Sequence, residues 1–229
     1  MNKLISPSLG LFLAAFTPTA HLHSQPDDAF IDSVIAYESG EGIATDFSTG
    51  APFDRIEATL GAPSTEIPGE FGGPVTPFSP PYLRDQLLSI GAGGRVTFSF
   101  EPPIFNQPGA PFGLDFTIFG NSGWNIVNGD FSGGGVTDGS QFGANPGETQ
   151  VWVSSDGEVF HRLDPAKAPT VDGAFPTDGQ GDPLRPMNPS VRPADFADAD
   201  MAAIRTLYNG SAGGASFDID WAENTPEPL

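Results

Sequence analysis

The chain has no cysteine among its 229 residues, which excludes disulfide bonds, thiol nucleophiles and thiolate metal sites. Histidine is almost as scarce. Two of the three histidines, His21 and His23, flank the expected start of the mature chain, so His161 is expected to be its only histidine. A zinc centre built from several histidines is therefore excluded as well.

Basic residues are also few, because 9 Lys+Arg stand against 29 Asp+Glu and give a formal charge of −20. Such a surface repels phosphate backbones, so neither nucleic acid nor an anionic membrane is expected as a partner. The simplest explanation of the charge is solubility outside the cell, which requires no binding site.

Glycine and proline are abundant, with 29 and 24 residues, which argues against a helix bundle or a coiled coil. The chain is nevertheless 38% hydrophobic and holds 19 phenylalanines, enough to fill a core, so global disorder is not expected. The length suits one domain, and no composition break or internal repeat divides the sequence. We expect a single domain over residues 25–222.

Residues 1–24 have the pattern of a secretory signal peptide. Lys3 supplies the positive charge, residues 9–16 the apolar run, and residues 17–20 the small residues for cleavage. A membrane anchor is the alternative, but the run is shorter than the roughly 20 residues of a spanning helix, and Pro7 and Pro18 bracket it. We therefore expect a secreted, extracellular or cell-surface protein without a membrane span in the mature chain.

Alternation of apolar and polar residues predicts strands near residues 32–37, 86–90, 95–100, 114–118, 149–153, 159–163 and 217–221. Asp156 and Gly157 between two such runs predict a hairpin, because both residues tolerate positive φ. Long excursions rich in glycine (residues 121–147) or proline (residues 165–193) are expected between strands. The pattern predicts an all-β fold, a jelly-roll-like antiparallel β-sandwich with long Gly/Pro-rich loops.

One short helix is predicted near residues 197–208, because apolar residues recur there at spacings of four, three and four. These residues are Ala197, Met201, Ile204 and Tyr208. Asp195 or Asp198 is expected to cap the start of the helix, and Asn209 with Gly210 to end it in a left-handed turn.

Six segments follow one another in a distinctive order. They are SVIAYESGEG (33–42), LGAP (60–63), SIGAGGRVTF (89–98), GLDFTIFGNS (113–122), VWVSSDG (151–157) and LYNGSAGGASFDI (207–219). In this order the chain resembles exported bacterial cell-surface proteins that often carry PEP-CTERM sorting tails. The resemblance implies a jelly-roll-like β-sandwich at or outside the cell surface, with no established enzymatic role.

Residues 223–229 form a proline-rich tail that ends in Thr-Pro-Glu-Pro-Leu. Pro-Glu-Pro resembles the opening of the sorting signal, but the transmembrane helix and basic tail of that signal do not follow. A plain proline-rich tail, a sorting remnant and a truncated gene or fragment remain alternatives. In the resembling proteins one or two more strands usually follow, so truncation of the sandwich is one of these alternatives.

Catalysis has little support in the sequence, and we predict that the protein is not an enzyme. Neither serine near a nucleophile-elbow pattern, Ser122 or Ser211, has both required glycines, and His161 has no evident nucleophile. A glycan-active hydrolase needs two facing acids. Its strand-associated candidates are Asp115, Glu148, Asp218 and Asp220, and pairs among 29 acids arise by chance.

Calcium is the better ligand hypothesis, because Ca²⁺ takes 6–8 oxygen ligands and the chain offers many. The predicted metal ligands are Asp115, Asp178, Asp182, Asp218 and Asp220. No segment matches a known calcium loop, and a solvated strand face is the simpler explanation of Asp218 and Asp220.

Two tryptophans and an asparagine are the predicted ligand-binding residues: Trp124 and Asn121 in the glycine-rich segment, and Trp152 on the polar side of its strand. An exposed aromatic face stacks well on a sugar ring, although Trp152 could equally pack under a long loop. The sequence thus predicts a non-catalytic, structural or adhesive surface module. Stabilisation of this module by calcium is a further hypothesis. A calcium-assisted carbohydrate-binding module that binds extracellular polysaccharide or cell-surface glycans is the first alternative.

Overall fold

The computed structural model describes residues 29–70, 72–143, 149–171 and 173–225. The predicted signal peptide, Glu148 and residues 226–229 of the predicted tail lie outside them. The strands are β1 (Ser33–Glu38), β2 (Glu66–Ile67), β3 (Gly73–Pro74), β4 (Arg95–Ser99), β5 (Phe116–Ile118), β6 (Gly123–Trp124), β7 (Val136–Thr137), β8 (Gln141–Phe142), β9 (Trp152–Val153), β10 (His161–Arg162), β11 (Ala199–Asp200) and β12 (Ala215–Phe217).

The described residues form a β-rich fold with one α-helix, α1 (Met201–Tyr208), as the sequence predicts at this coarse level. The strands pair two by two and antiparallel: β1 with β4, β2 with β3, β5 with β12, β6 with β8, β7 with β11, and β9 with β10. Much of the remaining chain is turn and extended loop, which accounts for the abundant glycine and proline.

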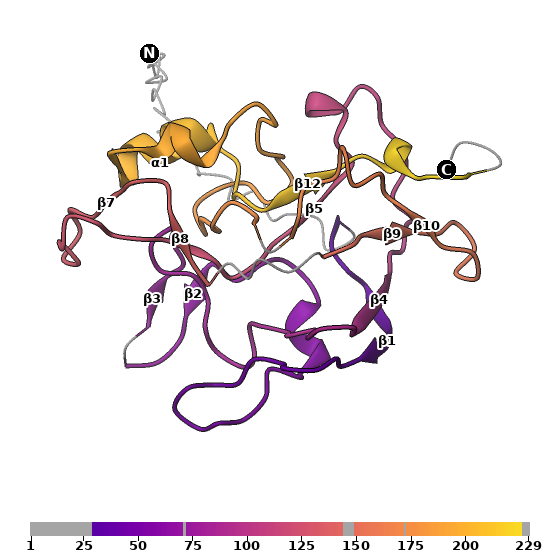
Figure 1. The fold of residues 1–229 in the computed structure, drawn as a ribbon, viewed down its shortest axis with the longest axis horizontal. Coiled ribbons are helices and arrows are strands. Elements are labelled where there is room, and N and C mark those ends of the chain that lie inside the picture. The colour runs from indigo at the N-terminus through magenta and orange to yellow at the C-terminus, as the bar shows by residue number, and fades with distance from the viewer. Residues whose placement is uncertain (1–28, 71, 144–148, 172, 226–229) are drawn as a thin grey trace, which may run out of the picture.

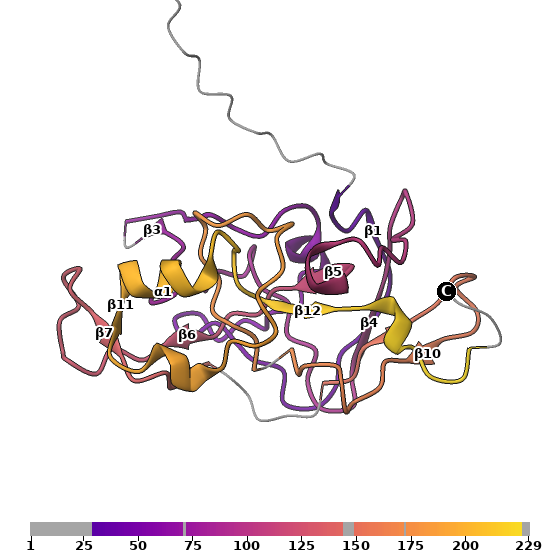
Figure 2. The same cartoon turned by 90° about the horizontal axis from the view of Figure 1, so that it is seen from above.

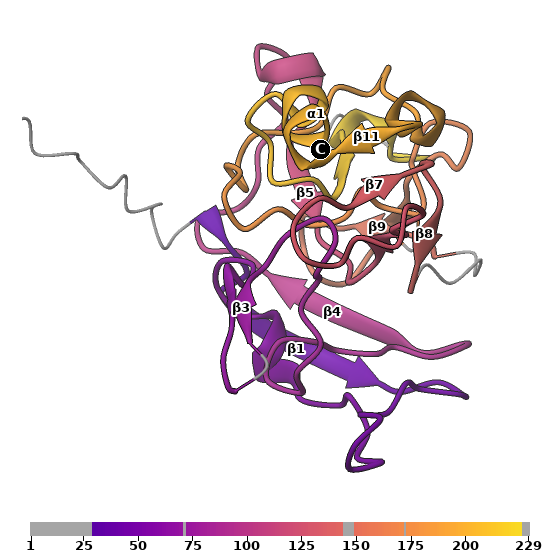
Figure 3. The ribbon, with the colours of Figure 1, turned by 90° about the vertical axis from the view of Figure 1, so that its left-hand side faces the viewer.

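The chain is arranged as two halves that lie one above the other (Figures 1 and 3). The N-terminal half, residues 29–110, contains the β1–β4 and β2–β3 pairs. The C-terminal half, residues 111–225, contains the other four pairs and α1. Figure 2 shows the chain after α1 crossing the C-terminal half through β12 towards β10.

Two of the predicted strands in the N-terminal half are confirmed, and one is wrong. β1 and β4 pair along their length, with a bulge between Val34 and Ala36 that leaves Ile35 exposed. Residues 86–90 form no strand. Their backbone instead bonds to loops, because Ser89 N–H donates to the Phe53 carbonyl and the Ile90 carbonyl accepts from Gly40 N–H.

Two buried clusters stabilise the C-terminal half. The first, called the aromatic core, consists of Trp124, Met187, Phe196, Ala199, Ile204 and Tyr208. The second, called the sheet core, consists of Leu163, Ala174, Ala215 and Phe217, with partly buried side chains such as Phe116, Val151, Val153 and Trp221 around them. Phe116 and Phe217 stack with ring centroids 5.3 Å apart, which joins β5 to β12 through their side chains.

Residues 211–217 link the two cores and are all buried. Gly213 has φ of 88°, and a Cβ built on it would lie 2.5 Å from the Pro176 carbonyl oxygen. Only glycine tolerates both the positive φ and this close approach. The glycine and alanine residues of this segment therefore serve packing of backbone against backbone.

The predicted helix begins later than expected. Ala199 and Asp200 form β11, and α1 starts at Met201. Asp200 caps it by accepting a hydrogen bond from Ala203 N–H at 2.8 Å, so the expectation that Asp195 or Asp198 would do so is wrong. Asn209 ends the helix in the left-handed conformation, with φ of 51° and ψ of 42°, as predicted.

Of the late strand predicted over residues 217–221, only Phe217 lies in a strand. β12 ends at Phe217, and a 3₁₀ helix, Ile219–Trp221, follows it. Two carboxylates favour this turn, since Asp218 accepts from Asp220 N–H at 2.8 Å and Asp115 accepts from Ile219 N–H at 2.9 Å. These local bonds satisfy backbone donors that a strand would have left for a neighbour.

Candidate functional site

The predicted hairpin around Asp156 and Gly157 is present and forms β9 and β10 (Figure 1). Its turn is held by the Asp156 carboxylate, which accepts hydrogen bonds from the backbone N–H groups of Glu158 and Val159, each at 2.8 Å. These bonds lower the pKa of Asp156, and the bond from Val159 N–H contributes most. The turn sequence thus fixes how the two strands align.

The hairpin has an inner and an outer face. Val151, Val153 and Leu163 pack on the sheet core. Strand alternation places Trp152 and its cross-strand partner Arg162 on the opposite, outer face. Leu163 N–H donates to the Val151 carbonyl at 2.9 Å, so those two residues form a hydrogen-bonded pair. Trp152 and Arg162 then form the non-hydrogen-bonded pair beside it, in which side chains come closest.

Trp152 is 50% exposed, as its place on the polar face of the strand predicts. Phe160 is also exposed, and alternation places it on the same face as Arg162 two residues later. The outer face of the hairpin therefore presents two aromatic side chains and a guanidinium group. This combination suits a ligand with one flat apolar side and polar groups at its rim.

A hollow of about 240 Å³ lies beside the hairpin, against the inner-face residues Val151 and Leu163. It is lined by Thr149, Gln150, Val151, Arg162, Leu163, Pro165, Ala168, Pro169 and Thr170. Because pockets that enclose drug-sized ligands measure roughly 300–1,000 Å³, this hollow has room for one small ring at the edge of a longer ligand. Arg162 belongs both to the hollow and to the Trp152 pair, so it joins them into one candidate site.

The prediction that Trp124 offers an aromatic face to a ligand is wrong. The side chain is fully buried in the aromatic core, with its ring centroid 4.6 Å from that of Phe196. Its Nε1 makes no well-aligned hydrogen bond within the described part of the chain, but it lies close enough to the Tyr208 hydroxyl to act on the pKa of that group. Next to it Tyr208 donates its hydroxyl hydrogen to the Pro176 carbonyl at 2.6 Å, and burial raises the pKa of that hydroxyl. Asn121 is exposed, but the structure does not place it in the hairpin site.

Three predicted metal ligands, Asp115, Asp218 and Asp220, do lie close together. Partial burial raises the pKa of the Asp218 carboxyl, and the charges of Asp115 and Asp220 add to that rise. The carboxylates already have partners, however. Asp115 accepts from Gln107 N–H at 2.8 Å as well as from Ile219, and Asp220 accepts from the Asn106 side-chain amide at 2.5 Å.

The other two predicted ligands are not a pair. Asp178 is buried and forms a bidentate ion pair with Arg205 of α1, at 2.7 and 3.1 Å. Asp182 is exposed and accepts a hydrogen bond from Leu184 N–H at 2.9 Å. Within the described residues, no group of three or more His, Cys, Asp or Glu side chains has the arrangement of a metal site.

A second hollow lies in the N-terminal half and was not predicted. It measures about 370 Å³ and is lined by Arg55, Glu57, Ala58 and Asp85. Asp85 is paired with Arg55, and both carboxylates are exposed to solvent. A general acid in glycoside hydrolysis needs a water-excluded setting that keeps it protonated, which this hollow does not provide.

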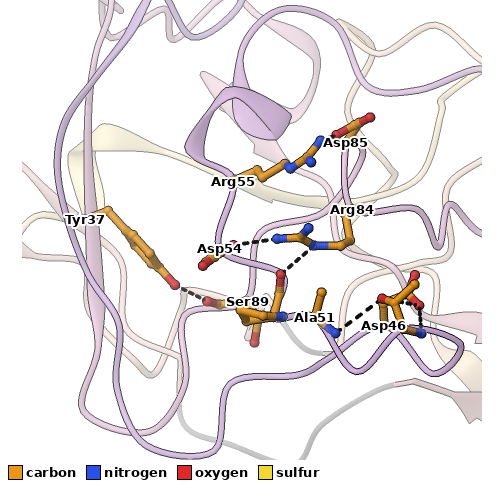
Figure 4. A network of polar contacts seen from close by, with 10 residues as sticks. Tyr37, Asp46, Ala51, Asp54, Arg55, Arg84, Asp85 and Ser89 are labelled. Atoms are coloured by element: carbon orange, nitrogen blue, oxygen red, sulfur yellow. Dashed lines mark hydrogen bonds and ion pairs between the residues drawn. The ribbon is translucent and has the colours of Figure 1, made fainter.

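The surrounding polar network is structural (Figure 4). Arg84 donates to the Pro52 carbonyl at 2.8 Å and to the Asp54 carboxylate at 3.0 Å. Tyr37 donates its hydroxyl hydrogen to the Ser89 carbonyl at 2.7 Å. These bonds fasten the loops at residues 44–55 and 83–89 to β1, where few buried apolar side chains are available to do so.

No known protein family, curated protein or solved structure matches the chain. Among the residues described, no helix has the length and apolar character needed to cross a membrane. The function must therefore be inferred from the site itself.

Proposed function

We propose that the protein is a secreted or cell-surface, non-catalytic adhesive module that binds glycans through the β9–β10 hairpin. The observation that carries this proposal is the half-exposed Trp152 beside Arg162 at the edge of a hollow. The predicted signal peptide and the resemblance to exported cell-surface proteins support the location. An aromatic face next to a hydrogen-bonding side chain is the chemistry that sugar rings require.

A non-catalytic role fits the placement of the acids better than a glycan-active hydrolase does. Among the residues that the structure describes, none that lines the hairpin hollow carries a carboxylate. The carboxylates of the other hollow are solvent-exposed, and one of them is paired with Arg55. His161 adds no base to the hairpin's outer face, since alternation turns it away from Arg162 and its Nδ1 lies 3.2 Å from the Glu223 carbonyl oxygen.

The proposed scaffold is a jelly-roll-like sandwich. The sheet core supports it, because the core takes side chains both from the β5–β12 pair and from the β9–β10 pair. Two layers that share one core are the basic arrangement of a sandwich. In this arrangement the outer face of β9–β10 is free to bind.

A glycan array tests the proposal, with wild type compared with Trp152→Ala. We expect binding of at least one glycan class by the wild type and its loss in the variant, because the ring would no longer be available for stacking. Phe131→Ala is the matched control, since Phe131 is 79% exposed and lies outside the hairpin. Wild-type protein that binds nothing, or equal loss in both variants, would overturn the proposal.

Calcium stabilisation remains part of the proposal, with Asp115, Asp218 and Asp220 as candidate ligands because their charges interact. For a dissociation constant of about 10⁻⁴–10⁻³ M, 10 mM calcium would stabilise the fold by about 1.4–2.7 kcal/mol. Thermal unfolding with calcium and with chelator measures this, at constant ionic strength. An unchanged midpoint would remove calcium and leave the glycan proposal intact.

A further inference from the structure

Arg162 differs from the other arginines of the described chain. Four of them pair with carboxylates within 4.0 Å: Arg55 with Asp85, Arg84 with Asp54, Arg95 with Glu38, and Arg205 with Asp178. Arg162 has no such partner among the described residues, although acids outnumber bases in the sequence by 29 to 9. A half-buried guanidinium at the edge of a hollow therefore keeps its charge-bearing donors available.

Arg185 and Arg192 also have no carboxylate partner, but their setting is different. Both are exposed, and neither lines one of the two hollows. Arg192 donates to the carbonyl oxygens of Pro189 and Val191, which satisfies part of its guanidinium. Arg162 alone of the three combines partial burial, a hollow and an exposed tryptophan across the strand.

The backbone around Arg162 is well fixed. Its carbonyl accepts from Glu223 N–H at 2.8 Å, and the next residue, Leu163, is buried in the sheet core. The side chain of Arg162 therefore starts from a defined backbone position, directly across the strands from Trp152. Its planar fork of N–H donors matches a carboxylate with two parallel hydrogen bonds, which a neutral hydroxyl group cannot accept in the same way.

We propose that the hairpin selects acidic glycans, with Arg162 pairing with the carboxylate of a uronic acid whose ring stacks on Trp152. This inference rests on the proposed glycan binding and names its ligand class. The net charge of −20 opposes a polyanion at long range. At physiological ionic strength the Debye length is about 8 Å, so exposed charges farther than this from Arg162 are largely screened.

Short uronic-acid oligomers, each compared with its own methyl ester, test this inference. The acid and the ester share the sugar ring and differ in charge. At 150 mM salt we expect the wild type to bind one acid of the panel about fivefold more tightly than its ester, as for a partly exposed ion pair. Arg162→Gln should abolish that difference and leave ester binding nearly unchanged, while Trp152→Ala should weaken both ligands.

Arg185→Gln serves as the control, because it removes an exposed arginine that lies outside the hairpin. Sulfated oligosaccharides form a separate arm, and preference for them over every uronic acid would overturn the carboxylate assignment. Equal affinity for acid and ester in the wild type would overturn acid selection and leave glycan binding standing. If the wild type binds neither these ligands nor any glycan on the array, both proposals fail.

Discussion

The two halves of the molecule are held together by different means. In the C-terminal half, large apolar side chains such as Trp124 and Phe217 fill two cores. The one ion pair of the described chain with a buried carboxylate links Arg205 of α1 to Asp178. In the N-terminal half, few apolar side chains are buried, and exposed ion pairs and loop-to-loop hydrogen bonds take their place (Figure 4). Because apolar burial supplies most folding energy, stability should depend mainly on the C-terminal half.

The two halves should differ most in how much the free energy of unfolding falls when an aromatic side chain is removed. Trp124→Ala should lower the free energy of unfolding by about 3–5 kcal/mol, because it leaves a cavity in the aromatic core. Phe47→Ala in the N-terminal half should change it by less than about 0.5 kcal/mol, since that side chain is fully exposed. Urea titration followed by circular dichroism measures both. Equal losses would contradict the division into two halves.

Loss of an ion pair should also lower the free energy of unfolding more in the C-terminal half than in the N-terminal half, although by less than loss of a core aromatic side chain. Arg205→Met leaves the Asp178 carboxylate, 3% exposed, without its partner, and we expect a loss of about 3 kcal/mol at pH 7. Arg95→Met breaks an exposed pair with Glu38 and should cost less than about 1 kcal/mol.

The double variant Asp178→Asn/Arg205→Met separates pairing from simple packing. It should recover much of the lost stability, because no unpaired buried charge remains. Urea titration of Asp178→Asn, Arg205→Met and the double variant gives the coupling energy, and strictly additive losses would show that the charge of Asp178 is not the cause.

Local patterns in the sequence predicted the elements that local chemistry decides. The β9–β10 hairpin follows from Asp156 and Gly157, and the left-handed end of α1 follows from Asn209. The strand predicted at residues 86–90 failed because its alternation was not matched by a neighbouring strand, and loops took its hydrogen bonds. Alternation alone cannot show whether such a neighbour exists.

The candidate site was predicted only in part, for the same reason. Strand alternation predicted the face of Trp152, but only the structure shows that no loop covers the side chain, which is 50% exposed. Trp124 was misplaced because glycine-rich surroundings resemble a surface loop, while the contact with Phe196 joins residues 72 positions apart. Arg162 and Arg205 were missed, since their roles depend on what lies across the strand or beside the helix. A pairing at long range leaves no periodic signal in a single sequence.

The smallest expected effects concern two aspartates whose pKa values shift in opposite directions. In the N-terminal half, hydrogen bonds from the Ser48 hydroxyl and from Thr49 lower the pKa of Asp46 to about 2. Its charged form thus stabilises the fold at neutral pH, and this stabilisation is lost as the pH falls from the unfolded value near 4 through about 2. In the C-terminal half, partial burial raises the pKa of Asp218, so its charged form opposes folding at neutral pH.

Asp218→Asn should therefore raise the free energy of unfolding at pH 7 by less than about 1 kcal/mol, measured with chelator present. The gain should decline as the pH falls through the raised pKa of Asp218 and vanish below the unfolded value near 4. The asparagine can still accept the hydrogen bond from Asp220 N–H, so the variant changes charge with little change in the turn. Asp46→Asn should instead lower the thermal midpoint at pH 7 and have no effect below about pH 2. Thermal unfolding between pH 2 and 7 follows both variants. The same sign of effect at pH 7 would mean that burial and like charges near Asp218 do not strain the C-terminal half, because solvent compensates them.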